Sequence, residues 1–158
     1  MEPQDMYRLA QDLGEAKNRQ NVYDALKFMH EDMVLESPAW GLVARGKTEN
    51  AAVLEAFFND YPDYHVSFDN YVADGSHFIG WGTVQMTMAA HAHDAGGQRP
   101  NGRRITLPVT IRMGFKDGLI AHEVFNCDLM QIALQSGITP NTIANAVFPM
   151  QKEADHAA

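Results

Sequence analysis

The sequence predicts an α+β domain, because its helical patterns and its strand patterns lie in separate parts of the chain. Apolar residues recur at helical spacing up to residue 61, whereas residues 64–127 read as strands. One more helical pattern follows residue 128. Helices segregated from a run of antiparallel strands are typical of the α+β class. A strongly curved sheet wrapped on its helices would leave a cavity at one end.

Three N-terminal helices are predicted from apolar residues that repeat at i, i+3, i+4 and i+7. Asn21 is the expected N-cap of the second helix and Thr48 that of the third, which Pro62 ends. Residues 33–35 read as a short strand between them. The repeating residues are Met6, Leu9, Ala10 and Leu13, then Val22, Ala25, Leu26 and Met29, then Leu54, Phe57, Phe58 and Tyr61.

Two hairpins are predicted after the helices. Residues 64–73 and 77–88 flank a turn at residues 74–76, and residues 103–127 fold back at Asp117-Gly118. Asp-Gly between two apolar runs is among the stronger short-range hairpin signals. Pro108 lacks an N–H, so it indicates an edge position or a bulge in the second hairpin.

Asp128 begins the last predicted helix. Gln131 follows it three residues later, which is the capping-box spacing, and Gly137 can end the helix after Leu134. The tail to residue 158 holds one apolar cluster, residues 143–150.

Composition excludes several classes of protein. At 158 residues the chain is expected to form one domain, with a core over about residues 5–137 and a tail over residues 138–158. The formal net charge of −8 argues against a nucleic-acid partner, and no run has the length of a membrane span. No signal peptide is visible and the single cysteine, Cys127, rules out an internal disulfide, so we expect a cytoplasmic protein.

The order of these elements, together with five local motifs, resembles the SnoaL-like polyketide cyclases of the nuclear-transport-factor-like superfamily. The motifs are residues 28–32 (FMHED), 44–47 (ARGK), 101–104 (NGRR), 116–120 (KDGLI), and Asp128 with residues 134–137 (LQSG). The resemblance implies a cone of curved antiparallel sheet wrapped on three N-terminal helices, with a deep apolar pocket. It also implies a homodimer, which we expect to form through the outer sheet face.

The family's acid/base aspartate lies three positions before the residue matched by Asp128, and here that position is Phe125. The matching pocket position on the preceding strand is Ile111, which is also inert. A phenyl ring cannot exchange a proton, so the family's usual aldol-type cyclisation loses its acid/base group.

Strand alternation supplies another candidate, Glu123. The expected inner face is otherwise apolar, and a carboxylate buried there keeps its proton at higher pH than one in water. Glu123 is therefore a candidate general acid/base, unless it is a solvated residue at a strand edge. The inner-face residues are Leu107, Val109, Ile111, Met113, Glu123, Phe125 and Cys127.

Four more side chains are candidates, each with a plainer alternative. Asp128 could contact a ligand at the pocket mouth or serve only as a helix cap. Glu36 follows a strand where relatives place a polar pocket residue, or it is a solvated loop carboxylate. Trp40 and Trp81 could stack on a flat substrate, or belong to the core or the dimer surface.

The histidines give weak signals. His91 and His93 have chelate spacing, but they lie in a polar connection without a third ligand nearby, so we expect no metal. His122 precedes Glu123 and should point away from it, and Arg112 should serve the outer face.

The sequence leaves two hypotheses for function. In the first, the protein is a cofactor-independent enzyme that acts by acid/base chemistry on a small apolar, cyclic or polyketide-like molecule. Glu123, Glu36 and Asp128 would be its catalytic groups, and Trp40, Trp81, Phe125, Ile111 and Met113 would bind substrate. In the second, which Phe125 favours, the pocket holds a hydrophobic metabolite without turning it over.

Overall fold

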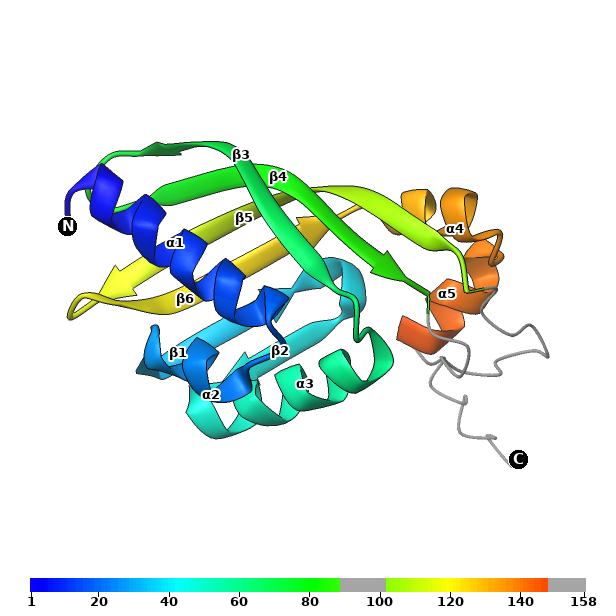
Figure 1. Ribbon diagram of the computed structural model, residues 1–158, viewed down its shortest axis with the longest axis horizontal. Helices are drawn as coiled ribbons and strands as arrows, with labels where there is room; N and C mark the ends of the chain where they lie inside the picture. Colours follow the sequence, from blue (N-terminus) through cyan, green and yellow to red (C-terminus); the bar gives the residue numbers. More distant parts are fainter. Residues whose placement is uncertain (89–101, 148–158) are drawn as a thin grey trace, which may run out of the picture.

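The computed structural model describes residues 1–88 and 102–147. They form a six-stranded sheet with the N-terminal helices packed on one side and the C-terminal helices at one end (Figure 1). The α+β prediction is confirmed. The helices are α1 (Pro3–Asn18), α2 (Val22–Lys27), α3 (Gly46–Asp60), α4 (Leu129–Ser136), α5 (Pro140–Val147) and the short 3₁₀ helix η1 (Pro38–Trp40). The strands are β1 (Met29–Ser37), β2 (Leu42–Arg45), β3 (His65–Ala73), β4 (Phe78–Thr87), β5 (Arg104–Lys116) and β6 (Leu119–Cys127).

The sheet has the strand order β2-β1-β6-β5-β4-β3. The β1–β6 pair is parallel and the other pairs are antiparallel, so the prediction of an antiparallel sheet holds for all but this pair. A parallel pair needs a long connection between its strands, which local sequence patterns do not reveal. The parallel pair joins the N-terminal part of the chain to the strands that follow α3.

Local signals set most element boundaries. The Asn21 side chain accepts a hydrogen bond from the Asp24 N–H, and Gly137 ends α4 with a left-handed backbone, φ 76°. The β5–β6 turn has positive φ at both Asp117 and Gly118, as a tight hairpin turn requires. Thr48 is not the N-cap of α3: the helix begins at Gly46, and the Glu49 carboxylate accepts the Arg45 N–H at 2.7 Å.

Pro108 lies in a central strand, but at a point where one neighbour is missing. The β5–β6 pairing begins only at Val109, so β5 runs on alone beside the end of β6. There the Gln135 side chain of α4 bonds both the N–H and the C=O of Thr106 at 2.8 Å. The backbone polar groups of residues 106 and 108 point to the same edge of β5, where no strand is paired. The missing N–H of Pro108 therefore breaks no hydrogen bond between strands.

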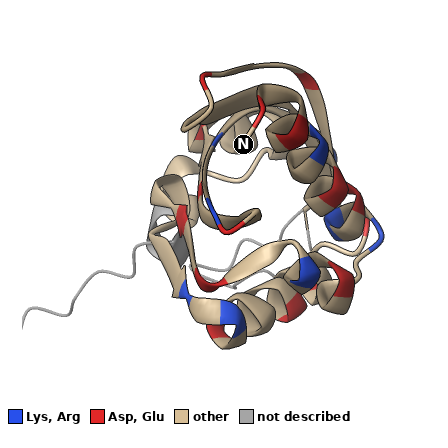
Figure 2. Cartoon of the chain, turned by 90° about the vertical axis from the view of Figure 1, so that its left-hand side faces the viewer, with Lys and Arg blue, Asp and Glu red and all other residues tan. Residues whose placement is uncertain are grey.

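α1 packs on β3 and β4, and α3 packs on β1 and β2. Figure 2 shows the sheet curling toward these helices, which carry residues of both charge signs. Gly82 permits a close approach of the β3 backbone to β4, because a Cβ there would lie 1.9 Å from the Ser67 carbonyl oxygen. No helix in the described ranges is long and apolar enough to cross a membrane.

A cluster of aromatic rings fills the end of the cone that holds the start of β4. Tyr7 of α1 stacks on Tyr71 with ring centroids 4.3 Å apart, and Phe68 and Phe78 meet the same cluster. Met113 pairs in register with Phe78 and lies in this packed half. The free space of the cone therefore lies away from this cluster, near the end of β4 and the start of β5.

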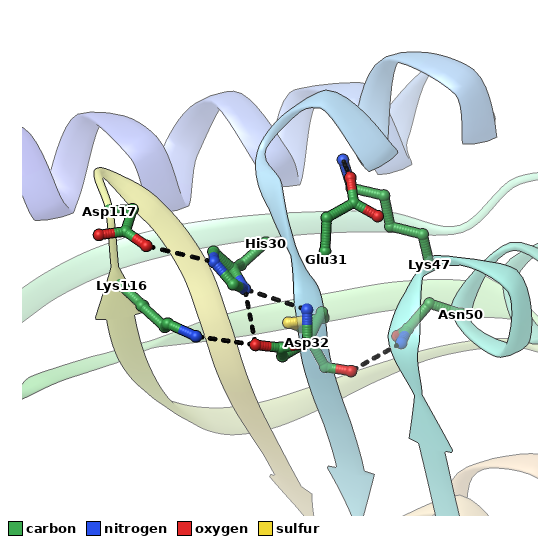
Figure 3. A network of polar contacts seen from close by, with 8 residues as sticks. His30, Glu31, Asp32, Lys47, Asn50, Lys116 and Asp117 are labelled. Carbon is green, nitrogen blue, oxygen red and sulfur yellow. Dashed lines mark hydrogen bonds and ion pairs between the residues drawn. The ribbon is translucent and has the colours of Figure 1, made fainter.

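A polar network joins the start of β1 to the β5–β6 turn (Figure 3). His30 lies between Asp32 and Asp117, at 3.6 and 3.5 Å, and Lys116 reaches Asp32 at 2.8 Å. Nearby, the buried Asn50 amide donates to the main-chain carbonyls of residues 33, 44 and 46. These contacts fix β1 against both β6 and α3, and both strands line the cavity described next.

Candidate active site

A cavity of about 320 Å³ opens between α3 and the inner face of the sheet. This volume is at the small end of ligand pockets, which run from about 300 to 1,000 Å³. Residues from α1, β1, η1, β2, α3, β4, β5 and β6 contribute, together with the segment between α3 and β3. They are Lys17, Leu35, Ser37, Trp40, Leu42, Val53, Leu54, Phe57, Phe58, Tyr61, Tyr64, Val84, Met86, Leu107, Glu123 and Phe125.

Aromatic rings form much of the cavity wall. The apolar stripe of α3 ends in Phe57, Phe58 and Tyr61, and Tyr64 follows before β3. Phe57 lies 4.8 Å from the Tyr61 ring and 5.2 Å from the Tyr64 ring, measured between centroids. Such a wall suits a flat, apolar ligand.

The charged groups of the cavity are Lys17 and Glu123, which bind one another. The Lys17 Nζ lies 2.8 Å from one Glu123 carboxylate oxygen and 2.9 Å from the other. Only 8% of Lys17 and 2% of Glu123 is exposed. The pair therefore presents a cation and an anion, with no net charge, to a largely apolar space.

Each member of the pair reaches the cavity for a simple geometric reason. Glu123 pairs in register with Met113 and shares its inward direction, as strand alternation predicted. Lys17 lies four residues after Leu13, on the buried stripe of α1. It is also in the last turn of α1, where the helix dipole favours a cation.

Two tyrosines, Tyr61 and Tyr64, line the same space. Burial raises the pKa of Tyr64, and the charge of Glu123 raises it further. Burial also raises the pKa of Tyr61, with a smaller contribution from Asp60. Both phenols consequently stay protonated near neutral pH and can donate hydrogen bonds to a ligand oxygen.

Cys127 lies beside the cavity residue Trp40. Burial raises the pKa of the Cys127 thiol, a hydrogen bond with Trp40 opposes that shift, and Asp128 adds to it. The thiol is therefore protonated near neutral pH and is a poor nucleophile there.

A family model for the SnoaL-like domain matches residues 10–123. The chain belongs to the SnoaL-like domain family. The match covers more than half of the chain, from α1 to the inward-facing Glu123.

Solved structures agree with this assignment of the SnoaL-like chain. A candidate polyketide cyclase from Xanthomonas campestris is 22% identical, with 85% of this chain and 98% of that one covered and a TM-score of 0.71. A candidate SnoaL-like polyketide cyclase from Shewanella putrefaciens is 13% identical, with 88% and 100% covered and a TM-score of 0.73. At such identities these likenesses establish the fold.

A third similar structure is a ketosteroid isomerase-like protein from Catenulispora acidiphila in complex with trimethylamine. It is 13% identical, with 83% of this chain and 93% of that chain covered and a TM-score of 0.71. No curated protein matches the sequence significantly.

Within this SnoaL-like domain, three of the predicted site residues line the cavity. They are Glu123, Phe125 and Trp40. Phe125 follows Glu123 by two residues and points to the same side, so the inner face of β6 keeps a carboxylate close to the family's acid/base position.

The structure does not bring the other predicted residues to the cavity. Asp128 is exposed and caps α4, accepting the Met130 N–H at 2.8 Å. Glu36 bonds His122 at 3.2 Å on the outer face, because it follows Leu35 in a longer β1 than predicted. Trp81 is also on the outer face, between the buried Gly80 and Gly82.

Ile111 and Met113 point inward as predicted but do not line the cavity. Both are buried in the packed half of the cone, toward the aromatic cluster around Phe78. Leu107, further along the same face of β5, contacts the cavity instead. Alternation gives the face of a residue but not whether free space lies above it, since the β6 register partners of Ile111 and Met113, Phe125 and Glu123, do line the cavity.

The metal prediction concerns His91 and His93, which lie outside the described residues. In residues 1–88 and 102–147, no cluster of histidine, cysteine, aspartate or glutamate could hold a metal ion. His122 points away from Glu123 and Arg112 is exposed, both as predicted.

The sequence reading missed Lys17, Ser37, Tyr61 and Tyr64 as site residues. The position of Lys17 could have been predicted from the sequence. It lies four residues after Leu13, so it continues the apolar stripe of α1 and is buried together with that stripe. Tyr61 belongs to the predicted apolar stripe of the third helix, which does pack on the sheet, but the end of that stripe borders free space.

Proposed function

We propose that this SnoaL-like protein is an acid/base enzyme, independent of a cofactor, that acts on a small, neutral, largely apolar carbonyl compound of cyclic or polyketide-like structure. The observation that carries the proposal is the buried Lys17–Glu123 pair at the wall of an aromatic cavity. A concave, mostly apolar pocket with a few convergent polar groups is the usual form of a ligand-binding or active site.

Glu123 is the proposed proton-transfer group. A ligand that fills the cavity excludes water from the carboxylate, and proton abstraction from carbon is more favourable for a desolvated base. The carbonyl oxygen of the ligand becomes more negative as the proton leaves. The Lys17 ammonium and the Tyr64 hydroxyl are donors in the same wall that can stabilise that oxygen.

The balanced charge of the pair favours a neutral ligand. A second anion or cation in the cavity would leave one charge without a partner in an apolar space, which is unfavourable. The aromatic wall of Trp40, Phe57 and Phe125 favours a planar ring system.

Exchange of carbon-bound hydrogen for deuterium tests the proposal without knowledge of the natural substrate. Cyclic ketones such as 2-indanone and 1-tetralone would be incubated with the protein in D₂O, and loss of the proton signal next to the carbonyl would be followed by NMR. We expect Glu123→Gln to slow protein-catalysed exchange by about 100-fold. Glu36→Gln and Asp128→Asn are matched controls and should leave it unchanged.

Ligand occupancy can be measured separately. Trp81→Phe leaves Trp40, a cavity residue, as the single tryptophan of the chain, so its fluorescence reports binding. Ketone binding without exchange would favour the second hypothesis, a binding module for a hydrophobic metabolite. Equal exchange by the parent protein and Glu123→Gln would remove Glu123 from the proposed mechanism.

A further inference from the structure

Lys17 differs from the other lysines that the structure describes. Lys27, Lys47 and Lys116 pair with Asp24, Glu31 and Asp32 at 2.6–2.9 Å on the protein surface. Lys17 is buried, and it lines the apolar cavity. A primary amine in such a place is a potential nucleophile as well as a cation.

Glu123 is placed to remove the proton that blocks this nucleophile. Both carboxylate oxygens are within 2.9 Å of the Lys17 Nζ, so a proton can pass between them without a water molecule. Transfer of that proton gives the neutral amine that can attack a carbonyl carbon, with the carboxylic acid of Glu123 beside it.

We propose that Lys17 forms an imine with a small apolar aldehyde or ketone in this cavity. The inference rests on the proposed function in one respect, the role of Glu123 as the group that moves protons. It adds a covalent intermediate, and it restricts the ligands to carbonyl compounds whose carbonyl carbon is open to attack.

The steps balance as follows. Glu123 takes one proton from the Lys17 ammonium, the free amine attacks the carbonyl carbon, and a nitrogen–carbon bond forms. A proton moves from that nitrogen to the former carbonyl oxygen, which gives a carbinolamine. Glu123 returns its proton to the hydroxyl, the carbon–oxygen bond breaks, and water leaves. The product is a protonated imine beside a carboxylate.

The same surroundings stabilise this product. The imine nitrogen carries the positive charge that the ammonium carried, next to Glu123 and at the C-terminal turn of α1. A protonated imine withdraws electrons from the adjacent carbon, so it makes a neighbouring C–H or C–C bond easier to break. Lys17 would then act as an electron sink and not only as the partner of Glu123.

Reductive trapping tests the inference directly. The protein would be incubated with 2-naphthaldehyde, benzaldehyde or butanone and sodium cyanoborohydride, digested, and mapped by mass spectrometry. We expect Lys17 to be alkylated about 10-fold or more faster than Lys27 and Lys116 in the same sample, because a bound carbonyl reacts as an intramolecular partner. Glu123→Gln should slow the labelling of Lys17 and leave that of Lys27 unchanged.

Lys17→Arg is the matched variant, because arginine retains the charge opposite Glu123 but forms no imine under these conditions. It should lose the fast-labelled site while retaining the fold, checked by circular dichroism. If none of the three probes labels Lys17 faster than Lys27 and Lys116, the inference is wrong.

The two aldehydes have no hydrogen on the carbon next to the carbonyl, so they report imine formation alone. Loss of preferential labelling while Glu123-dependent deuterium exchange persists would reject the imine and leave the proposed function standing. Preferential labelling of Lys17 without deuterium exchange in the cyclic ketones would reject proton abstraction from carbon. It would support Lys17 as a nucleophile.

Discussion

Two consecutive residues of β6 take part in pairs on opposite faces of the sheet. His122 binds Glu36 at 3.2 Å on the outer face, where 38% and 37% of the two side chains are exposed. Glu123 binds Lys17 on the inner face, where both are buried. In each pair a carboxylate therefore contacts a basic side chain at a similar distance. The inner pair is shielded from water, whereas the outer pair is in contact with it.

The medium decides what each pair can do. An exposed pair is screened by water and contributes about 0–1 kcal/mol. A buried pair loses hydration when it forms, and well-packed apolar residues would often serve stability as well or better. The inner pair is therefore poorly explained by stability, which directs attention to its position at the cavity wall.

The largest expected effect comes from breaking the inner pair. Lys17→Met leaves the Glu123 carboxylate buried without its cation. We expect a loss of about 3–5 kcal/mol in the free energy of unfolding, because an uncompensated buried charge is strongly destabilising. Urea denaturation near neutral pH measures it.

The double variant Lys17→Met/Glu123→Leu is the control, since it removes both charges. It should recover most of the stability that the single variant loses. A loss below about 1 kcal/mol for Lys17→Met, as for an exposed pair, would mean that Glu123 is solvated and the two faces do not differ.

Asp63 separates the effect of exposure from that of hydrogen bonding. Its side chain is 37% exposed, as for Glu36, but it accepts bonds from the Thr87 N–H and hydroxyl and from the Arg104 guanidinium. Burial alone would raise the pKa of Asp63, yet the bonds from Thr87, with the charge of Arg104, lower it overall. Asp63 also fixes the loop that carries Tyr61 and Tyr64.

The sign of the pH dependence follows from the lowered pKa. The stability that ionised Asp63 contributes is present above the unfolded pKa of about 4 and is lost as the pH falls through the folded pKa. Asp63→Asn should therefore lower the free energy of unfolding by about 1 kcal/mol at neutral pH, a value reduced by solvent screening. The difference from the parent protein should shrink on acidification below the unfolded pKa.

Urea titrations of both proteins at about pH 7 and about pH 3 measure this change. Glu36→Gln, with one bond at the same exposure, is the comparison and should show a smaller difference at neutral pH. If the stability difference between Asp63→Asn and the parent protein stays constant or grows in acid, ionised Asp63 does not stabilise the fold.

Local patterns predicted the parts of the fold that depend on near neighbours. The Asn21 cap, the Asp117-Gly118 turn, the Asp128 cap and the end of α4 at Gly137 each involve residues within a few positions of one another. The inward direction of Glu123 follows from a period of two. The helix α5 was missed, although Thr139 accepts the Thr142 N–H at 3.3 Å as an N-cap does and Pro140 occupies its first position.

The cavity depends on distances that local patterns do not contain. Ile111 and Leu107 share one face of β5, yet only Leu107 reaches free space, because α1 and the aromatic cluster fill the other half. Glu36 and Trp81 were assigned to the pocket without knowledge of which way their strands face. Lys17 pairs with a residue 106 positions away, and only the fold brings the two together.

The smallest expected effect lies in the outer pair, and it tests whether the outer face is free. With Glu36 and His122 in water, Glu36→Gln, His122→Ala and the double variant should give a coupling energy below about 1 kcal/mol in a double-mutant cycle. The homodimer expected from the family resemblance would cover this face and remove water from the pair. A coupling energy well above 1 kcal/mol that falls as the protein is diluted would therefore show that a second copy buries the pair. Sedimentation velocity of the same samples would show the dimer. A small coupling energy at every concentration would leave the outer pair solvated, and the contrast with the inner pair would then hold for the protein in solution.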